Sequence, residues 1–288
     1  MAFGEMSPFN TPYGANAPGG NSMLSPYRQA EANAKRSPKV RQQVRSAESR
    51  IIPEDKPRPR WPKNTTVLSS TTQGTLSWGS YYSDALLHNL NHSGSMLAAQ
   101  KQLEKTGFLI PTGNGRQTPQ IPVSSKGRPW TNAGWQKGQR KTRNVLIIKG
   151  SGKNRLQDQM LDAQVSNYQQ TLQQQYGGDI HFTVLDQPNP AQVQQAFRQM
   201  KGFSDHHRHA EAMVVCLGHG GIQRPGNLLD RKYQGASEGN IELQIGPQGQ
   251  ATSTLSENHM KHMFHQYMGG YDAVNLVMVP CHSGAWVG

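Results

Sequence analysis

The chain has 288 residues, of which 34% are hydrophobic and 17% are charged, and its formal net charge is +12. It contains no run of about 18 consecutive apolar residues and no basic start followed by an apolar stretch, so we expect neither a membrane span nor Sec-type secretion. Its two cysteines, Cys216 and Cys281, exclude a disulfide framework and a four-thiolate zinc site, and they are typical of a protein of a reducing compartment.

The positive charge lies in the first half of the sequence. Residues 1–143 contain 20 Lys and Arg against 7 Asp and Glu, whereas residues 144–288 contain 10 against 11. Such a basic half could bind an acidic partner, an acidic lipid surface or nucleic acid, or it could simply be solvated. Trp130 and Trp135 lie among the basic residues and could stack on bases, but no nucleic-acid-binding fold is recognisable, so nucleic acid is the less favoured partner.

The first half divides into two segments. Residues 1–65 are basic, rich in Pro, Gly, Ser and Asn, and poor in large apolar side chains. Because such a segment cannot bury enough surface to offset its chain entropy, we expect it to be disordered. Residues 66–143 are expected to be a Gly/Pro-rich linker or a partly ordered accessory segment, in which residues 83–106 have leucines near helical spacing interrupted by Gly94.

From residue 144 onward, apolar runs alternate with amphipathic segments, and residues 144–288 are expected to form one domain. Strands are expected at residues 144–149, 181–185, 211–217 and 273–279, of which the first and the last are buried. Helices are expected over 156–176, after an Asn189 cap followed by Pro190, and over 256–267, with a hairpin over 241–255. This order predicts an α/β fold, with a mostly parallel, doubly wound sheet and helices on both faces.

Parallel α/β sheets form their functional sites beyond the carboxyl ends of the strands. His219 follows the third expected strand within LGHGG, and Cys281 follows the fourth within VPCHSG. If these strands are neighbours, the thiol and the imidazole can approach each other, as a cysteine nucleophile and its histidine require. Glycines beside both residues would let backbone N–H groups face a substrate oxygen. The alternative is a buried cysteine at a strand end and a structural histidine.

The motif GHG around His219, together with CHSG beginning at Cys281, resembles the caspase-like cysteine peptidases, the superfamily of metacaspases, caspases and legumain. The order of elements over residues 144–288 resembles that superfamily as well. The resemblance implies a caspase-like three-layer sandwich and an endopeptidase that acts on host or self proteins. It also implies that Cys281 attacks the peptide carbonyl, that His219 protonates the leaving amine, and that the N–H groups of Gly220 and Cys281 bind the oxyanion.

Two features depart from the pattern of that superfamily. Members that cleave after Arg or Lys carry an acid two residues before the cysteine, where this chain has Val279. The fold of the superfamily continues with further strands that help to form the substrate pocket, whereas seven residues follow Cys281 here. Three alternatives stay open: residues 66–143 build this wall of the substrate pocket, the domain is incomplete, or the protein does not cleave peptides.

The loop after the first expected strand carries two basic residues, Lys153 and Arg155. It resembles a phosphate-binding loop, but Ile147 stands where Walker A requires a glycine and Asn154 where it requires Ser or Thr, so nucleotide binding is not expected. By resemblance to a basic residue on the corresponding loop of caspases, Lys153 or Arg155 would contact an acidic residue of the substrate. The alternative is that both charges are solvated in front of a helix.

No metal or cofactor is expected. The histidines at positions 206, 207 and 209 are neighbours on a predicted turn, and neighbouring ligands rarely close a tetrahedral site. Those at 259, 262 and 265 recur every three residues, so they drift around the helix axis and cannot share one site.

A second function stays open beside the peptidase. The protein could be a catalytically inactive member of the same fold that binds a partner or a polyanion through its basic half. The Ser-, Pro- and Asn-rich start also resembles the export segments of bacterial type III effectors. We therefore expect a cytoplasmic protein, with type III delivery into a host cell as the alternative.

Overall fold

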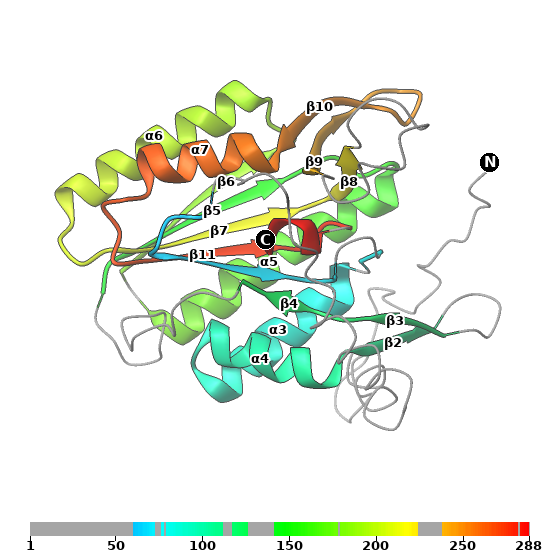
Figure 1. Cartoon of the computed structure of the whole chain (residues 1–288), viewed down its shortest axis with the longest axis horizontal. Helices are drawn as coiled ribbons and strands as arrows, with labels where there is room; N and C mark the ends of the chain where they lie inside the picture. Colours follow the sequence, from blue (N-terminus) through cyan, green and yellow to red (C-terminus); the bar gives the residue numbers. More distant parts are fainter. Residues whose placement is uncertain are drawn as a thin grey trace.

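The computed structural model describes part of the chain, and within that part it shows an α/β fold built on one central sheet (Figure 1). The described residues are 60–72, 76–77, 79–111, 117–125, 141–177, 179–223, 238–281 and 283–287. Most of the segment expected to be disordered, residues 1–65, lies outside them, and so does the basic stretch 126–140 with both of its tryptophans. None of the described helices has the length and apolar character needed to cross a bilayer.

The central sheet contains six strands. They are β1 (Thr65–Ser69), β4 (Val123–Ser124), β5 (Arg143–Lys149), β6 (Ile180–Asp186), β7 (Glu211–Leu217) and β11 (Ala273–Met278). Their order is β4-β1-β11-β7-β5-β6, and neighbours are parallel except β4, which is antiparallel to β1. The predicted α/β fold with a mostly parallel sheet is confirmed, and the four strands expected after residue 143 are present.

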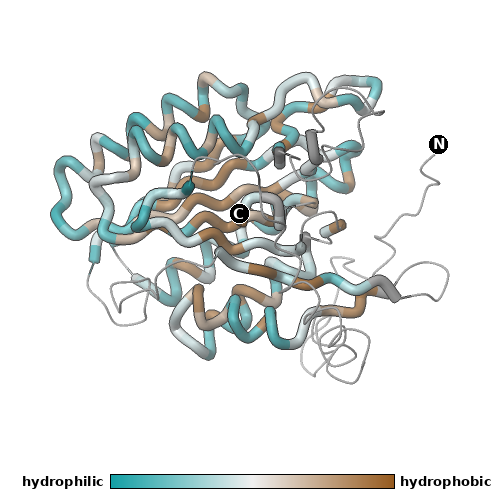
Figure 2. Tube along the Cα trace, viewed as in Figure 1, coloured by the Kyte–Doolittle hydropathy of each residue, from teal (hydrophilic) through white to brown (hydrophobic). Residues whose placement is uncertain are grey.

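Helices cover both faces of this sheet, as the alternation of elements predicts. The helices are α3 (Gly79–Ser93), α4 (Met96–Thr106), α5 (Arg155–Tyr176), α6 (Pro190–His206) and α7 (Glu257–Tyr267). One face packs against α3, α4 and α5, and the other against α6 and α7 (Figure 1). Successive strand residues point to opposite faces, so Val145 and Leu146 of β5 belong to different apolar clusters. Figure 2 shows the apolar residues concentrated along the central strands.

Polar residues cap the helices of the second half. The Asn189 side chain accepts a hydrogen bond from the N–H of Gln192, and Pro190 is the first residue of α6, so the expected cap is confirmed. Ser256 caps α7 in the same way, and Asn154 caps α5. These caps fix where each helix begins and therefore where the loops before the helices lie.

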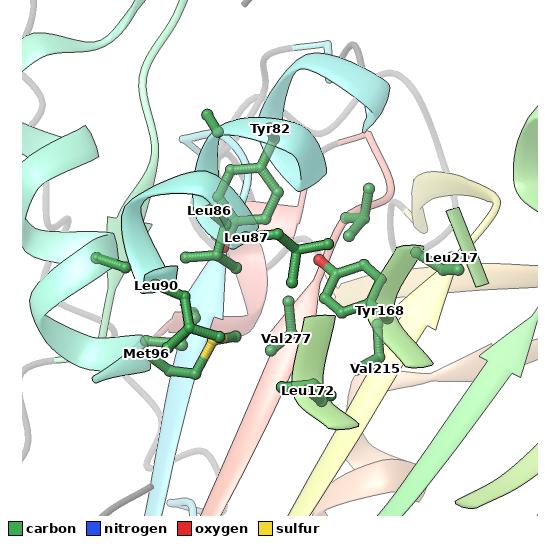
Figure 3. Close-up of a cluster of buried hydrophobic side chains, with 14 of the residues drawn as sticks. Tyr82, Leu86, Leu87, Leu90, Met96, Tyr168, Leu172, Val215, Leu217 and Val277 are labelled. Carbon is green, nitrogen blue, oxygen red and sulfur yellow. The ribbon is translucent and has the colours of Figure 1, made fainter. Parts of the chain in front are cut away.

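The described residues between 60 and 125 belong to the same core as the rest of the fold. Strand β1 pairs in parallel with β11, with Thr65 opposite Val274 and Ser69 opposite Met278. The expected helix over 83–106 is present as two helices, and Gly94 between them has a φ of 67°, a left-handed conformation that ends α3. The two helices pack against α5 and the sheet in a cluster shown in Figure 3, which includes Tyr82, Leu86, Leu87, Leu90, Met96, Tyr168, Leu172, Val215, Leu217 and Val277.

Two smaller sheets flank the central one. The expected hairpin is confirmed as β9 (Glu238–Ile245) and β10 (Ala251–Ser256), whose turn is closed by a hydrogen bond from the N–H of Gly246 to the carbonyl of Gln250. A strand absent from the predictions, β8 (His219–Gln223), extends this hairpin into a sheet of order β10-β9-β8. A two-stranded sheet is formed by β2 (Phe108–Pro111) and β3 (Gln117–Gln120).

Two tryptophans join the two ends of the described chain. After β11 the chain forms the short 3₁₀ helix η2 (Ser283–Val287), which buries Trp286 at 1% exposure. The indole N–H of Trp61, just before β1, donates to the Trp286 carbonyl at 2.7 Å, and the two rings stack at 6.3 Å between centroids. A side chain on Gly239 would meet the Trp286 indole at 2.3 Å, so this position needs a glycine. The loop that carries Cys281 is therefore anchored on its far side.

Candidate functional site

The loops that carry His219 and Cys281 meet at the carboxyl edge of the central sheet. Strands β7 and β11 are neighbours, with Cys216 opposite Met278, and the two loops leave these strands on the same side (Figure 1). A Cβ on Gly220 would lie 2.5 Å from the Cys281 carbonyl oxygen, so a side chain at position 220 would have no room. The structure therefore brings together three of the residues expected at the site.

Glycine also allows the turn into the His219 loop. Gly218 has a φ of 129°, which residues with a side chain rarely adopt, and its Cβ would lie 3.2 Å from the Gly150 Cα. The loop after β5 thus packs directly against the loop after β7. This contact carries the loop that contains Lys153 to the same edge of the sheet.

Of the two basic residues expected at the site, Lys153 is the one whose charge acts on both His219 and Cys281. Its charge lowers the pKa of both the His219 imidazole and the Cys281 thiol. Arg155 is exposed as the first residue of α5, and within the described chain no interaction with His219 or Cys281 is found for it. Of the two basic residues, Lys153 is therefore the one that belongs to the surroundings of Cys281.

His219 is a largely buried imidazole that binds a glutamine. Its Nε2 lies 3.2 Å from Oε1 of Gln157, in the first turn of α5. Burial, and to a lesser extent the charge of Lys153, lowers the pKa of His219 to about 4, although the carboxylate of Asp158 partly opposes this shift. The imidazole is therefore neutral at pH 7 and has a lone pair that can take up a proton.

Cys281 is a thiol held by the backbone of a distant residue. Its Sγ accepts a hydrogen bond from the N–H of Ser77 at 3.3 Å and lies 3.5 Å from the Ser77 carbonyl oxygen. Burial raises the pKa of Cys281 above its usual value, while the Ser77 N–H and the charge of Lys153 lower it and the carboxylate of Glu242 raises it. The group is a thiol rather than a thiolate at pH 7. No hydrogen bond joins it to His219 in the part of the chain described.

The carboxyl end of β1 holds the Cys281 loop on both sides of the cysteine. The Ser70 hydroxyl donates to the Val279 carbonyl at 2.8 Å, two residues before Cys281. Two residues after it, the Ser283 hydroxyl lies 2.7 Å from that of Ser69 and 3.0 Å from that of Ser70. Together with Ser77, these contacts mean that the amino-terminal segment forms one wall of the site.

Two buried glutamines support this serine cluster, which consists of Ser69, Ser70, Ser77 and Ser283. The Gln100 amide donates to the Ser69 carbonyl at 3.1 Å, and the Gln120 amide donates to the Ser70 carbonyl at 3.0 Å. Buried polar groups that are satisfied in this way specify one arrangement, because any other would leave donors or acceptors unpaired. None of these residues was expected at the site, since only the pairing of β1 with β11 brings them there.

The histidine clusters weighed as metal ligands are not assembled into a site. No group of three or more metal-ligating side chains is found among the described residues. His209 instead lies 3.1 Å from the carboxylate of Asp272, and the ring of His207 packs on that of Phe203. His282, next to the cysteine, lies outside the described residues.

No family model, curated protein or solved structure matches the chain. The chemistry of the residues at the carboxyl edge of the sheet therefore carries the functional argument.

The pKa of His219 makes the stability of the fold depend on pH. Because folding lowers this pKa from an ordinary 6.5 to about 4, the unfolded chain binds the proton more tightly, and stability is lost as the pH falls from 6.5 towards 4. Between pH 7.5 and pH 5 the contribution is about 2 kcal/mol of the free energy of unfolding. Urea unfolding of wild type and His219→Gln at both pH values measures it. An equal loss in the two proteins would contradict this assignment.

The two cysteines should differ in their reaction with iodoacetamide. Only a thiolate reacts, so labelling of Cys281 should be slow at pH 7 and rise about tenfold per pH unit up to pH 9. Cys216 is completely buried in β7 and burial raises its pKa, so it should react only after unfolding. Mass spectrometry of the two peptides provides the measurement. Fast labelling of Cys281 that is constant from pH 6 to pH 8 would show a thiolate and contradict the raised pKa.

Proposed function

We propose that the chain is a cysteine endopeptidase of caspase-like architecture in which Cys281 is the nucleophile and His219 transfers protons. The observation that carries this proposal is the contact between the loops after two neighbouring parallel strands, where Gly220 lies against the backbone of Cys281. At pH 7 His219 is neutral and Cys281 is a thiol, so in this proposal the proton transfer accompanies the attack on the substrate.

The chemistry begins with the thiol. As Sγ of Cys281 bonds to the carbonyl carbon of the scissile peptide, the thiol proton passes to His219 and the carbonyl electrons move onto the oxygen. The N–H groups of Gly220 and Cys281 are the donors assigned to that oxyanion. When the intermediate collapses, the C–N bond breaks and the imidazolium gives its proton to the leaving amine. Water then adds to the thioester carbonyl while His219 accepts its proton, the C–S bond breaks, and His219 returns the proton to the sulfur of Cys281.

The strand order supports a completed site. In the caspase-like superfamily, further strands beyond the cysteine help to form the substrate pocket. Here β1 and β4, from the amino-terminal segment, occupy the places beyond β11. Of the three alternatives that the sequence left open, this arrangement favours the one in which residues 66–143 build the wall.

Lys153 is the proposed contact for an acidic residue of the protein substrate. Its charge acts on both Cys281 and His219, so an acidic side chain bound close to the scissile bond would lie within its field. Arg155 has no comparable support. The substrate class is therefore an extended segment of a host or self protein with an acidic residue near the cleavage point.

One observation favours a second candidate, a non-catalytic protein on the same fold. Cys281 and His219 bind Ser77 and Gln157, and among the described residues no hydrogen bond joins them to each other. In an active enzyme this separation would close when the substrate displaces water and tightens the site, as catalytic hydrogen bonds commonly do. In a protein that only binds partners, Cys281 and His219 would stay separated.

A library of peptidyl acyloxymethyl ketones that varies the residue before the electrophile distinguishes the two candidates. The peptidase should form a covalent adduct at Cys281 with a restricted set of these peptides, and His219→Gln should suppress the adduct. Iodoacetamide labelling of unfolded protein serves as a control for thiol integrity. If no peptide of the library reacts while Cys281 is intact, the endopeptidase proposal is wrong.

A further inference from the structure

The amide oxygen of Gln157 accepts two hydrogen bonds at the edge of the site. Gln157 is the third residue of α5, and its Oε1 lies 2.7 Å from the backbone nitrogen of Lys153 and 3.2 Å from Nε2 of His219. A backbone N–H can only donate. The side-chain atom that faces both groups must therefore be the oxygen and not the amide nitrogen.

This orientation determines which ring nitrogen of His219 carries the proton. An amide oxygen cannot donate, so the hydrogen bond to Gln157 requires a proton on Nε2 of His219. A neutral imidazole has one proton, and burial keeps this imidazole neutral at pH 7. The remaining nitrogen, Nδ1, then has the free lone pair.

We propose that Gln157 is a positioning residue that holds His219 as the Nε2–H tautomer, so that Nδ1 is the nitrogen that exchanges a proton with Cys281. The tautomer itself follows from the hydrogen bonds of Gln157, and only the exchange with Cys281 rests on the proposed function. Gln157 touches no reacting atom in this scheme and acts through His219.

The loop before α5 keeps the oxygen of Gln157 in place before any substrate binds. The N–H of Gln157 donates to the Asn154 side chain at 2.9 Å, and the N–H of Gly152 donates to the Asp158 carboxylate at 2.7 Å. Gln157 is thus held at its backbone by the helix cap and at its side chain by Lys153. This preorganisation lets one side chain orient the imidazole without a rearrangement.

The absence of charge on Gln157 matters as much as its oxygen. Lys153 lowers the pKa of His219 and Asp158 raises it, and Glu242 of β9 lies directly opposite His219 in the pairing with β8. A carboxylate in place of the Gln157 amide would accept the same hydrogen bond but would also favour the imidazolium. The imidazole would then stay protonated up to a higher pH, and over that range it could not take the proton of the Cys281 thiol.

Nitrogen-15 NMR of the histidine rings tests the proposal directly, with the His219 signals assigned by their loss in His219→Gln. Wild type at pH 7.5 should show a protonated Nε2 and an unprotonated Nδ1. Gln157→Leu, which removes the acceptor at similar volume, should lose this single tautomer, and Gln157→Glu should keep Nε2–H but raise the pKa of His219. Gln173→Leu, an exposed substitution later on the same helix, should match wild type.

Kinetics provide the second readout. Gln157→Leu should lower kcat about tenfold with little change in KM, the effect of one hydrogen bond on a reacting group. Gln157→Glu should retain cleavage but move the acidic limb of the pH–rate profile to higher pH. Circular dichroism of each variant establishes whether it is folded. If Gln157→Leu does not fold, Gln157→Glu still tests the proposal.

The outcomes separate this proposal from the peptidase proposal, because the tautomer is measured without substrate. A proton on Nδ1 in wild type, or an unchanged tautomer in folded Gln157→Leu, would overturn the positioning role. The expected tautomers together with no cleavage by wild type would uphold that role and overturn the peptidase.

Discussion

His219→Gln should lower the rate of peptide cleavage at neutral pH by about 10²- to 10⁴-fold, the range that a proton-transferring side chain contributes. Glutamine fills a similar space but cannot take the thiol proton or protonate the leaving amine. KM should change little, because His219 is assigned proton transfer at the scissile bond and no contact with the rest of the substrate. Initial rates with a cleaved peptide from the library measure both constants.

The matched control is His209→Gln. The His209 side chain is 78% exposed at the opposite edge of the sheet, where it pairs with Asp272. The same substitution there should leave the rate within a factor of about two. If His219→Gln is equally harmless in a folded protein, His219 is a structural histidine and the proposed proton transfer is wrong.

Loss of the amino-terminal wall should have the largest effect on folding. A chain of residues 141–288 alone should fail to form a cooperative fold, because β11 would lose its neighbour β1 and the apolar face under α5 would lose α3 and α4. Leu68→Ala provides the milder version in the full chain. Leu68 is completely buried, so this variant should lose about 2 to 5 kcal/mol of the free energy of unfolding.

Urea denaturation measures the loss, with Leu156→Ala as the control. Leu156 is 50% exposed, so the same substitution should cost far less stability there. Leu68→Ala should also reduce cleavage, since Ser69 and Ser70 follow Leu68 directly and hold the Cys281 loop. Cooperative unfolding of the isolated 141–288 chain would contradict the role assigned to β1.

The second half of the fold could be predicted because three of its strands, β5, β7 and β11, are buried throughout, while the edge strand β6 is only partly exposed. Residues 145–148 of β5 form an uninterrupted apolar run, and caps such as Asn189 mark where the helices begin. Strand β1 was missed because Val67 and Leu68 are a short apolar pair between hydroxyl residues. Its partner β11 lies about two hundred residues away in sequence, and no local pattern reports such a pairing.

Part of the site could also be predicted from the sequence, and part of it could not. His219 and Cys281 each follow a predicted strand beside glycines, so their meeting could be expected from the order of the elements. Strand β8 was hidden because glycines weaken the strand propensity of its sequence. Ser77 and Gln157 carry no chemical signature of their own, and they act at the site only through contacts that tertiary packing creates.

The proposed activity is tested most directly by adding purified wild type or Cys281→Ala to cell lysate and cataloguing new protein N-termini by mass spectrometry. Ends that arise only with wild type and share one preceding residue are the expected result, and they would reveal the specificity at the same time. Identical catalogues from two folded proteins would contradict the peptidase and leave partner binding as the function of this fold.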